Sequence, residues 1–368
     1  MSDPRPRPST YDKRVALVLQ GGGALGSYQA GVYEALAGSD YLPDWVAGIS
    51  IGAINAAIIA GNAPEHRVER LRRFWETVTT PAGPLGAFDA ANRDIGAATA
   101  LILGQSGFFA PRPLTGWSAT PEGASFYDTS ALKGTLERLV DFDRINAREM
   151  RLSVGAVNVR TGNFAYFDNS KIQIRAEHIM ASGALPPGFP SVEIDGEHYW
   201  DGGLVSNTPL QYVLTTVPRR SRLTFQVDLF ASRGPLPTTL DEVMERAKDV
   251  RYSSRTRAAT DTMARMHDLR HNINELWQQL PDELRHTPAA RFLYAFGCVT
   301  TMDIVEIIYR PGEPLGQSKD YEFSRRTMHD RWAQGVADAR TTLAVSPWLA
   351  PAEPGLGART FDVLFPGR

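Results

Sequence analysis

The stretch GISIGAINA, residues 48–56, decides how the rest of the chain is interpreted. It overlaps a short apolar run, WVAGI (45–49), and continues into small apolar residues that suit a buried helix. Ser50 stands between Gly48 and Gly52, and this spacing is typical of a nucleophile on a tight turn from a strand to a helix. An alcohol is a poor nucleophile near neutral pH, so such a serine needs a group that removes its proton.

The same order of elements occurs once before, at the start of the chain. VALVL (15–19) indicates a buried strand, the glycine loop GGGALG (21–26) follows it, and residues 27–38 indicate a helix. Two strand–loop–helix units within about 50 residues favour adjacent parallel strands with crossover helices. The sequence therefore predicts an α/β sandwich with a central, mostly parallel sheet.

The glycine loop has two functional interpretations and one purely structural one. It satisfies G-x-G-x-x-G between a strand and a helix, which is the dinucleotide-binding pattern. That pattern also needs an acidic residue near the end of the second strand, whereas Asp40 and Asp44 precede this strand. Alternatively, the free N–H groups of the loop stabilise an oxyanion, or the loop is only a tight turn.

The base could be an aspartate or a histidine. Asp201 ends a predicted hairpin strand in YWDGGLVSNTPL (199–210), where two glycines turn the chain away and can leave its carboxylate facing a cleft. D-G is also an ordinary turn signal. An α/β-hydrolase would add a histidine, but only two strands precede Ser50 here. His198 is close to Asp201 in sequence, but it belongs to the other face of the strand, so we expect it to be structural or exposed.

Taken together, GGGALG (21–26), GISIG (48–52) and DGG (201–203) resemble the motifs of the patatin-like phospholipases. ASGALPPGFP (181–190) is similar to a small-residue and proline segment of that family. The resemblance covers about residues 14–210. It implies a three-layer sandwich and hydrolysis of fatty-acyl esters in phospholipids, lysophospholipids or glycerides. The alternative is a non-catalytic protein that binds a nucleotide or a lipid through GGGALG.

The resemblance also implies roles for individual residues. Ser50 would be the nucleophile and Asp201 its base, without a histidine, and the N–H groups of Gly22, Gly23 and Ala24 would form the oxyanion hole. No cofactor or metal is implied. Many family members carry Arg or Lys where this chain has Leu25, so we expect no positive charge near the oxyanion site. The remaining motif glycines are Gly21, Gly26, Gly48, Gly52, Gly202 and Gly203.

The composition limits the class of protein and its compartment. The net charge of -2 among 368 residues gives no indication of a nucleic-acid partner. Cys298 is the single cysteine, which excludes an intramolecular disulfide and favours a reducing compartment. No apolar run suits a signal peptide or a bilayer span, so we expect a cytoplasmic protein, peripheral at the membrane if it contacts one. The oligomeric state is left open.

Three regions are expected along the chain. Residues 1–13 indicate a disordered lead-in, residues 14–235 a catalytic domain, and residues 236–368 a mainly helical extension packed on it. Within the catalytic domain, 81–121 is rich in Pro, Gly and aromatics, which suggests a lid or an acyl-site insertion. Residues 95–117 are the candidate membrane-facing surface, through Leu101, Ile102, Phe108, Phe109 and Trp117, although a plain core helix with a packed loop would explain the same composition.

Overall fold

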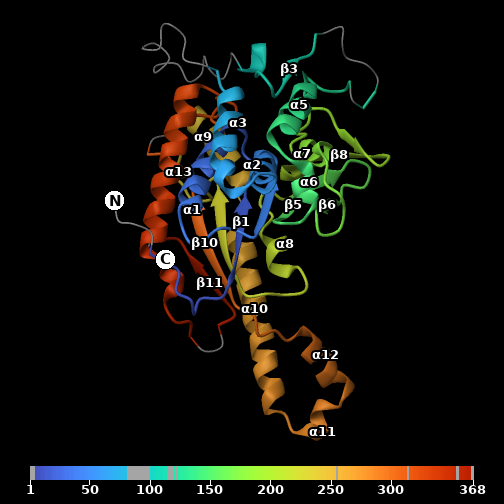
Figure 1. Ribbon diagram of the computed structural model, residues 1–368, viewed down its shortest axis with the longest axis vertical. Coiled ribbons are helices and arrows are strands. Elements are labelled where there is room, and N and C mark those ends of the chain that lie inside the picture. The colour runs from blue at the N-terminus through green and yellow to red at the C-terminus, as the bar shows by residue number, and fades with distance from the viewer. Residues whose placement is uncertain are drawn as a thin grey trace.

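The computed structural model describes residues 5–80, 100–113, 120–121, 123–253, 256–312, 315–353 and 356–365 (Figure 1). The strands are β1 (Arg14–Leu19), β2 (Trp45–Ile49), β3 (Ala110–Pro111), β4 (Tyr127–Asp128), β5 (Arg151–Asn158), β6 (Phe164–Asp168), β7 (Val192–Ile194), β8 (Glu197–Asp201), β9 (Arg222–Asp228), β10 (Met302–Ile308) and β11 (Ala358–Phe361). The helices are α1 (Gly26–Ala37), α2 (Ile51–Ala60), α3 (Arg67–Thr77), α5 (Ser130–Leu139), α6 (Phe142–Asn146), α7 (Ala176–Ser182), α8 (Leu210–Thr215), α9 (Leu240–Tyr252), α10 (Thr256–Gln279), α11 (Asp282–Arg285), α12 (Pro288–Phe296) and α13 (Arg325–Val345).

The main sheet is mostly parallel, as the sequence predicts. Its parallel part has the order β11-β10-β9-β1-β2-β5, and β6, β7 and β8 join it as antiparallel strands. β1 and β2 are direct parallel neighbours, which confirms the two strand–loop–helix units. Their carboxyl ends therefore meet at one edge, where open α/β sheets bind their ligands.

Helices cover both faces of this sheet, which makes three layers. Along β1, Leu17 and Leu19 belong to the large core shared with α1, α2, α3 and α13. The alternate residues Ala16 and Val18 belong to a smaller core that includes Leu210 of α8. Successive side chains of a strand point to opposite faces of the sheet, and both faces of a central parallel strand are buried. Alternate residues of β1 therefore belong to different cores.

The region beyond residue 236 is mainly helical, but it also completes the sheet. β10 and β11 extend the parallel order next to β9, and α13 lies along α1, where Tyr28 donates a hydrogen bond to Asp338 at 2.7 Å. Thr239 and Glu242 form a capping box at the start of α9. α10 leaves the body at the lower end and forms a projection with α11 and α12 (Figure 1).

The N-terminal lead-in is held to the body from residue 5 onward, contrary to expectation. Tyr11 donates a hydrogen bond to Asp303 at 2.8 Å, and Lys13 forms an ion pair with the same carboxylate at 2.6 Å. Asp303 is fully buried, so these partners stabilise a charge that burial would otherwise penalise. The prediction of disorder is therefore wrong for this part of residues 1–13.

The expected insertion at 81–121 is only partly described. Residues 81–99 and 114–119, which include Trp117, lie outside the described residues, and so does residue 122 just beyond it. Leu101 and Ile102 are exposed, by 43% and 69%. Phe108 and Phe109 are instead buried and pack against two further rings, those of Phe189 and Phe323.

The expectation that Phe108 and Phe109 form an exposed surface is wrong, because they complete an aromatic cluster of the core. The membrane-facing role of this segment stays a prediction for Leu101 and Ile102. No helix in the described ranges is both long enough and apolar enough to cross a bilayer.

Candidate active site

Ser50 occupies a strained turn between β2 and α2. Its φ of 55° and ψ of -124° lie where residues other than glycine are rare, and such strain persists only when the surrounding structure enforces it. The flanking glycines make this turn possible. A Cβ on Gly48 would lie 2.2 Å from the carbonyl oxygen of Gly52, and one on Gly52 would lie 2.4 Å from that of Leu19. The predicted strand-to-helix elbow is therefore present.

Asp201 is the last residue of β8 and is only 2% exposed. Burial raises the pKa of its carboxyl to about 7, although hydrogen bonds from the Ser50 side chain and from the backbone of Gly203 act in the opposite direction. The Gly203 N–H donates to Oδ1 of Asp201 at 2.7 Å. The buried carboxyl thus contacts Ser50, whose own side chain is half-buried.

The register of β5 explains how Ser50 and Asp201, which are 151 positions apart in sequence, meet. Gly155 of β5 pairs with Ile49 of β2 and, on its other side, with β6. Ala156 pairs with β6 and with Asp201 of β8. Because a strand residue has only two pairing edges, β2 and β8 must lie along the same edge of β5 and run toward each other. Ser50 and Asp201 therefore meet where the two strands end.

Ser182 holds the backbone of Ser50 in place. The Ser50 N–H donates to both the carbonyl oxygen and Oγ of Ser182, each at 3.0 Å. Oγ of Ser182 in turn donates to the carbonyl of Gly155 at 2.6 Å. Ser182 belongs to the ASGALPPGFP segment (181–190), and no local pattern in that segment indicates that its hydroxyl supports Ser50.

The glycine loop lies beside Ser50, as predicted from the parallel strands. A Cβ on Gly21 would lie 3.1 Å from Cβ of Ser50. Asn207 holds this glycine from both sides, because its carbonyl accepts from the Gly21 N–H at 3.1 Å and its side-chain amide donates to the Gly21 carbonyl at 3.0 Å. In the described part of the chain, the N–H groups of Gly22 and Gly23 have no hydrogen-bond partner. These two groups stay candidates for the predicted oxyanion hole.

Ala24 does not offer a third donor in this structure. Its N–H donates to the carbonyl of Asp320 at 2.7 Å, and that carbonyl lies so close that a Cβ on Gly23 would be 2.1 Å from it. The prediction that Ala24 contributes to the oxyanion hole is therefore wrong here. The cause is a contact with the segment before α13, which no local motif indicates.

A buried cation lies beside the glycine loop, although Leu25 replaces the basic residue of many family members. The guanidinium of Arg331, on α13, donates to the carbonyl of Ala24 at 3.2 Å and to that of Lys319 at 2.9 Å. Leu25 itself is fully buried in the core. Arg331 also pairs with Glu322 at 3.8 Å, so this cation is partly neutralised, and the absence of a positive charge at the oxyanion site itself stays a prediction.

The histidines form their contacts elsewhere. Nδ1 of His178 accepts from the Arg175 N–H at 2.9 Å, and His198 contacts Oγ of Ser191 at 3.1 Å. Across the described residues, no group of three or more His, Cys, Asp or Glu side chains is arranged to hold a metal ion. What the site offers is a strained serine, a buried carboxyl and free backbone donors, which suits nucleophilic acyl transfer.

Comparison with protein families gives two matches along the chain. The model of patatin-like phospholipases matches residues 17–214, which is more than half of the 368 residues and contains every motif described above. The chain belongs to the patatin-like phospholipase family. A second model, of patatin phospholipases, matches residues 250–355, which lie within the predicted C-terminal extension. Family membership identifies the protein as an enzyme of the lipid acyl hydrolase class, and it does not favour the nucleotide-binding alternative.

Solved structures give more distant similarities. VipD from Legionella pneumophila is 14% identical over 89% of this chain and 67% of that chain, with a TM-score of 0.33. The type III effector ExoU is 12% identical over 93% of this chain and 54% of that chain, with a TM-score of 0.30. ExoU in its complex with SpcU from Pseudomonas aeruginosa is 18% identical over 70% of this chain and 52% of that chain, with a TM-score of 0.28.

The patatin-like chain thus spans about two thirds of VipD and about half of ExoU. A comparison with curated protein sequences gives no match. The family assignment rests on the matched sequence.

Proposed function

We propose that the protein hydrolyses fatty-acyl esters, with Ser50 as the nucleophile and Asp201 as its base. One observation carries the proposal: the strained Ser50 contacts a buried carboxyl whose pKa is about 7. A base is most effective when its pKa lies near the working pH, and an ordinary exposed aspartate with a pKa near 4 would be too weak. By raising the pKa of Asp201, burial gives the aspartate the basicity that a histidine has in a catalytic triad.

Acylation follows from the positions of these groups. The Asp201 carboxylate takes the proton of the Ser50 hydroxyl as Oγ attacks the carbonyl carbon of the ester. The negative charge that develops on the carbonyl oxygen is stabilised by the N–H groups of Gly22 and Gly23 and by the N-terminus of α2. The tetrahedral intermediate collapses when Asp201 passes the proton to the leaving alcohol, and an acyl-Ser50 ester remains.

Deacylation repeats these steps with water. Asp201 takes a proton from water as its oxygen attacks the acyl-Ser50 carbonyl, the same N–H groups stabilise the oxyanion, and the proton returns to Oγ of Ser50 as the fatty acid leaves. The family resemblance supports phospholipids, lysophospholipids or glycerides as substrates. Interfacial substrates would approach the protein past Leu101 and Ile102, the exposed apolar side chains of the 95–117 segment.

A fluorophosphonate probe tests the nucleophile, because it phosphonylates activated serines and leaves ordinary ones unmodified. We expect labelling of wild-type protein at the peptide that contains Ser50, and no labelling of Ser50→Ala. Ser206→Ala is the matched control, because it removes a hydroxyl from the loop that follows Asp201 without contact to the proposed dyad. This variant should label as the wild type does.

Hydrolysis of a p-nitrophenyl ester tests the base. Asp201→Asn should lower kcat by about a hundredfold or more, because an amide cannot accept the proton. Asp195→Asn is the matched control: Asp195 lies at the exposed turn of the same β7–β8 hairpin with a φ of 51°, which asparagine tolerates. An active Asp201→Asn, or a probe label on a different serine, would overturn the dyad.

A further inference from the structure

A cavity of about 720 Å³ opens at the carboxyl ends of β9 and β10. Leu229 follows β9, and Tyr309 and Arg310 follow β10, so the cavity lies at the same edge of the sheet as the glycine loop. Neither Ser50 nor Asp201 lines it. The cavity is therefore a separate site at the functional edge, and its volume lies in the range of small-molecule pockets.

The glycine loop and the cavity share a wall. A Cβ on Gly22 would lie 2.7 Å from Cδ1 of Leu229, so this leucine contacts the loop on one side and lines the cavity on the other. Lys319 also lines the cavity, and its neighbour Asp320 accepts the Ala24 N–H. A ligand in the cavity would thus lie one side chain away from the proposed oxyanion hole.

The rim of the cavity carries an exposed apolar side chain. Leu236 lines the cavity and is 89% exposed, between Pro235 and Pro237. This rim is anchored, since the guanidinium of Arg246 on α9 donates to the carbonyls of Ala231 and Ser232. A ligand whose hydrocarbon chain covers this exposed leucine would remove apolar surface from water, which favours binding.

The acidic groups at one end of the cavity are already paired. The side chain of Lys319 is only 5% exposed and contacts Glu245 at 3.0 Å and Asp249 at 2.5 Å. Glu245 also accepts the N–H groups of Leu315 and Gly316. Glu242, Glu245 and Asp249 outnumber the cations Lys319 and Arg246 among the side chains that line this end, so it is less favourable for an anion.

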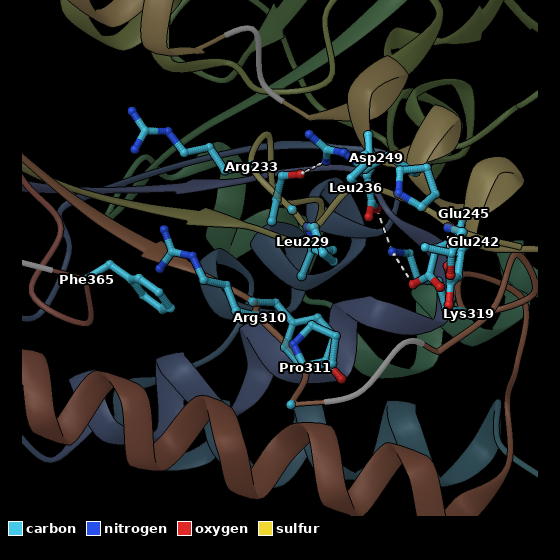
Figure 2. A pocket seen from close by; sticks show the side chains of 18 residues that line it. Leu229, Arg233, Leu236, Glu242, Glu245, Asp249, Arg310, Pro311, Lys319 and Phe365 are labelled. Carbon is cyan, nitrogen blue, oxygen red and sulfur yellow. Dashed lines mark hydrogen bonds and ion pairs between the residues drawn. The ribbon is translucent and has the colours of Figure 1, made fainter. Parts of the chain in front are cut away.

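The opposite end is cationic. Figure 2 shows Arg233 and Arg310 on one side of the cavity, away from Glu242, Glu245 and Asp249. Arg310 is paired with Asp362 at 2.6 Å. Arg233 is exposed and, within the described ranges, has no hydrogen bond or ion pair. The cavity therefore combines one available guanidinium, an apolar wall and a distant anionic end.

We propose that this cavity binds a long-chain fatty acid, with its carboxylate on Arg233 and its chain over Leu229 and Leu236. An amphiphile with one anionic head matches this arrangement, because its head can pair with Arg233 and its chain can cover the apolar wall. The source of the ligand rests on the proposed function: ester hydrolysis at Ser50 releases a fatty acid beside the shared wall. A lysophospholipid with an anionic head has related chemistry, and the experiment distinguishes the two.

Binding is measured with Ser50→Ala protein, so the result does not depend on turnover. A fluorescent polyene fatty acid is titrated below its micelle concentration, and palmitate is used to displace it. We expect saturable binding that Arg233→Gln weakens about tenfold or more, as loss of a charge-assisted hydrogen bond does. Leu236→Asp should weaken it similarly and leave the fold intact, because the side chain is exposed. Arg73→Gln is the matched control, an exposed arginine on α3 that does not line the cavity.

Three results would overturn the proposal: no saturable binding, equal displacement by hexadecanol and palmitate, or equal affinity in Arg233→Gln. Stronger displacement by lysophosphatidic acid than by palmitate would assign the cavity to the lysolipid instead. Failure of the proposed function has a different signature, because a wild-type protein that hydrolyses no ester could still bind fatty acid in this assay.

Discussion

Asp201 should make the protein less stable at the pH where it is most active. Its carboxyl has a pKa of about 7 in the folded protein, compared with 3.8 for an exposed aspartate. Below pH 4 the group is protonated in both the folded and unfolded states. Between pH 4 and 7 the unfolded chain loses this proton and the folded chain keeps it, so the free energy of unfolding falls as the pH rises.

The size of this penalty follows from the two pKa values. Each pKa unit corresponds to about 1.4 kcal/mol, so the penalty reaches about 4 kcal/mol above pH 7 as an upper bound. Asp201→Asn removes it. We expect urea unfolding at pH 8.5 to show the variant more stable than the wild type by about 2–4 kcal/mol, and this difference to shrink by about 2 kcal/mol at pH 5.5.

Activity should rise with pH over the range in which the free energy of unfolding falls. The wild-type kcat should rise along an acidic limb centred near pH 7, and it should be about tenfold lower at pH 6 than at its plateau. Asp195→Asn should retain both the limb and the wild-type stability. A stability difference between Asp201→Asn and wild type that does not change with pH, or an acidic limb well below pH 6, would refute a buried carboxyl as the base.

Further predictions concern the elbow and the apolar segment. Gly52→Ala should unfold the protein or lower its melting temperature sharply, because the new Cβ would lie 2.4 Å from the Leu19 carbonyl, whereas Gly134→Ala in α5 meets only a flexible arginine end and should be neutral or stabilising in thermal melts. Phe109→Asp should cost about 3–5 kcal/mol in urea unfolding because it opens the aromatic cluster, as large core truncations do. Ile102→Asp should leave stability unchanged but lower the hydrolysis of micellar esters relative to soluble ones. Equal effects on both substrates would exclude an interfacial role for this segment.

The order of elements and the local geometry of the candidate site could be predicted from local sequence. The apolar run 45–49, the glycines around Ser50 and the small-residue helix after it define the elbow without any tertiary information, because only glycine permits the close approaches at positions 48 and 52. The hairpins that end in Asp168 and Asp201 and the capping box at Thr239 are local in the same sense. Turn and cap preferences are properties of short segments.

Contacts between distant segments could not be predicted in this way. Phe108 and Phe109 form an apolar pair in a proline-rich stretch, and nothing in their own segment indicates that Phe189 and Phe323 bury them. The cation of Arg331 lies beside the glycine loop although 307 residues separate it from Ala24. Such contacts depend on which helices pack together, and composition does not encode that.

The sequence by itself determined the candidate site residues: a serine on a forced turn, a glycine loop after the preceding strand, and an aspartate at the end of a hairpin. Only the tertiary structure decided how they meet. β2 and β8 run toward each other along one edge of β5, which brings Asp201 to Ser50 and buries it, and the Asp320 carbonyl takes the N–H of Ala24. The physical reason is that strand pairing and burial are set by the whole sheet. Burial, which no motif specifies, is what raises the pKa of Asp201 to the value a base requires.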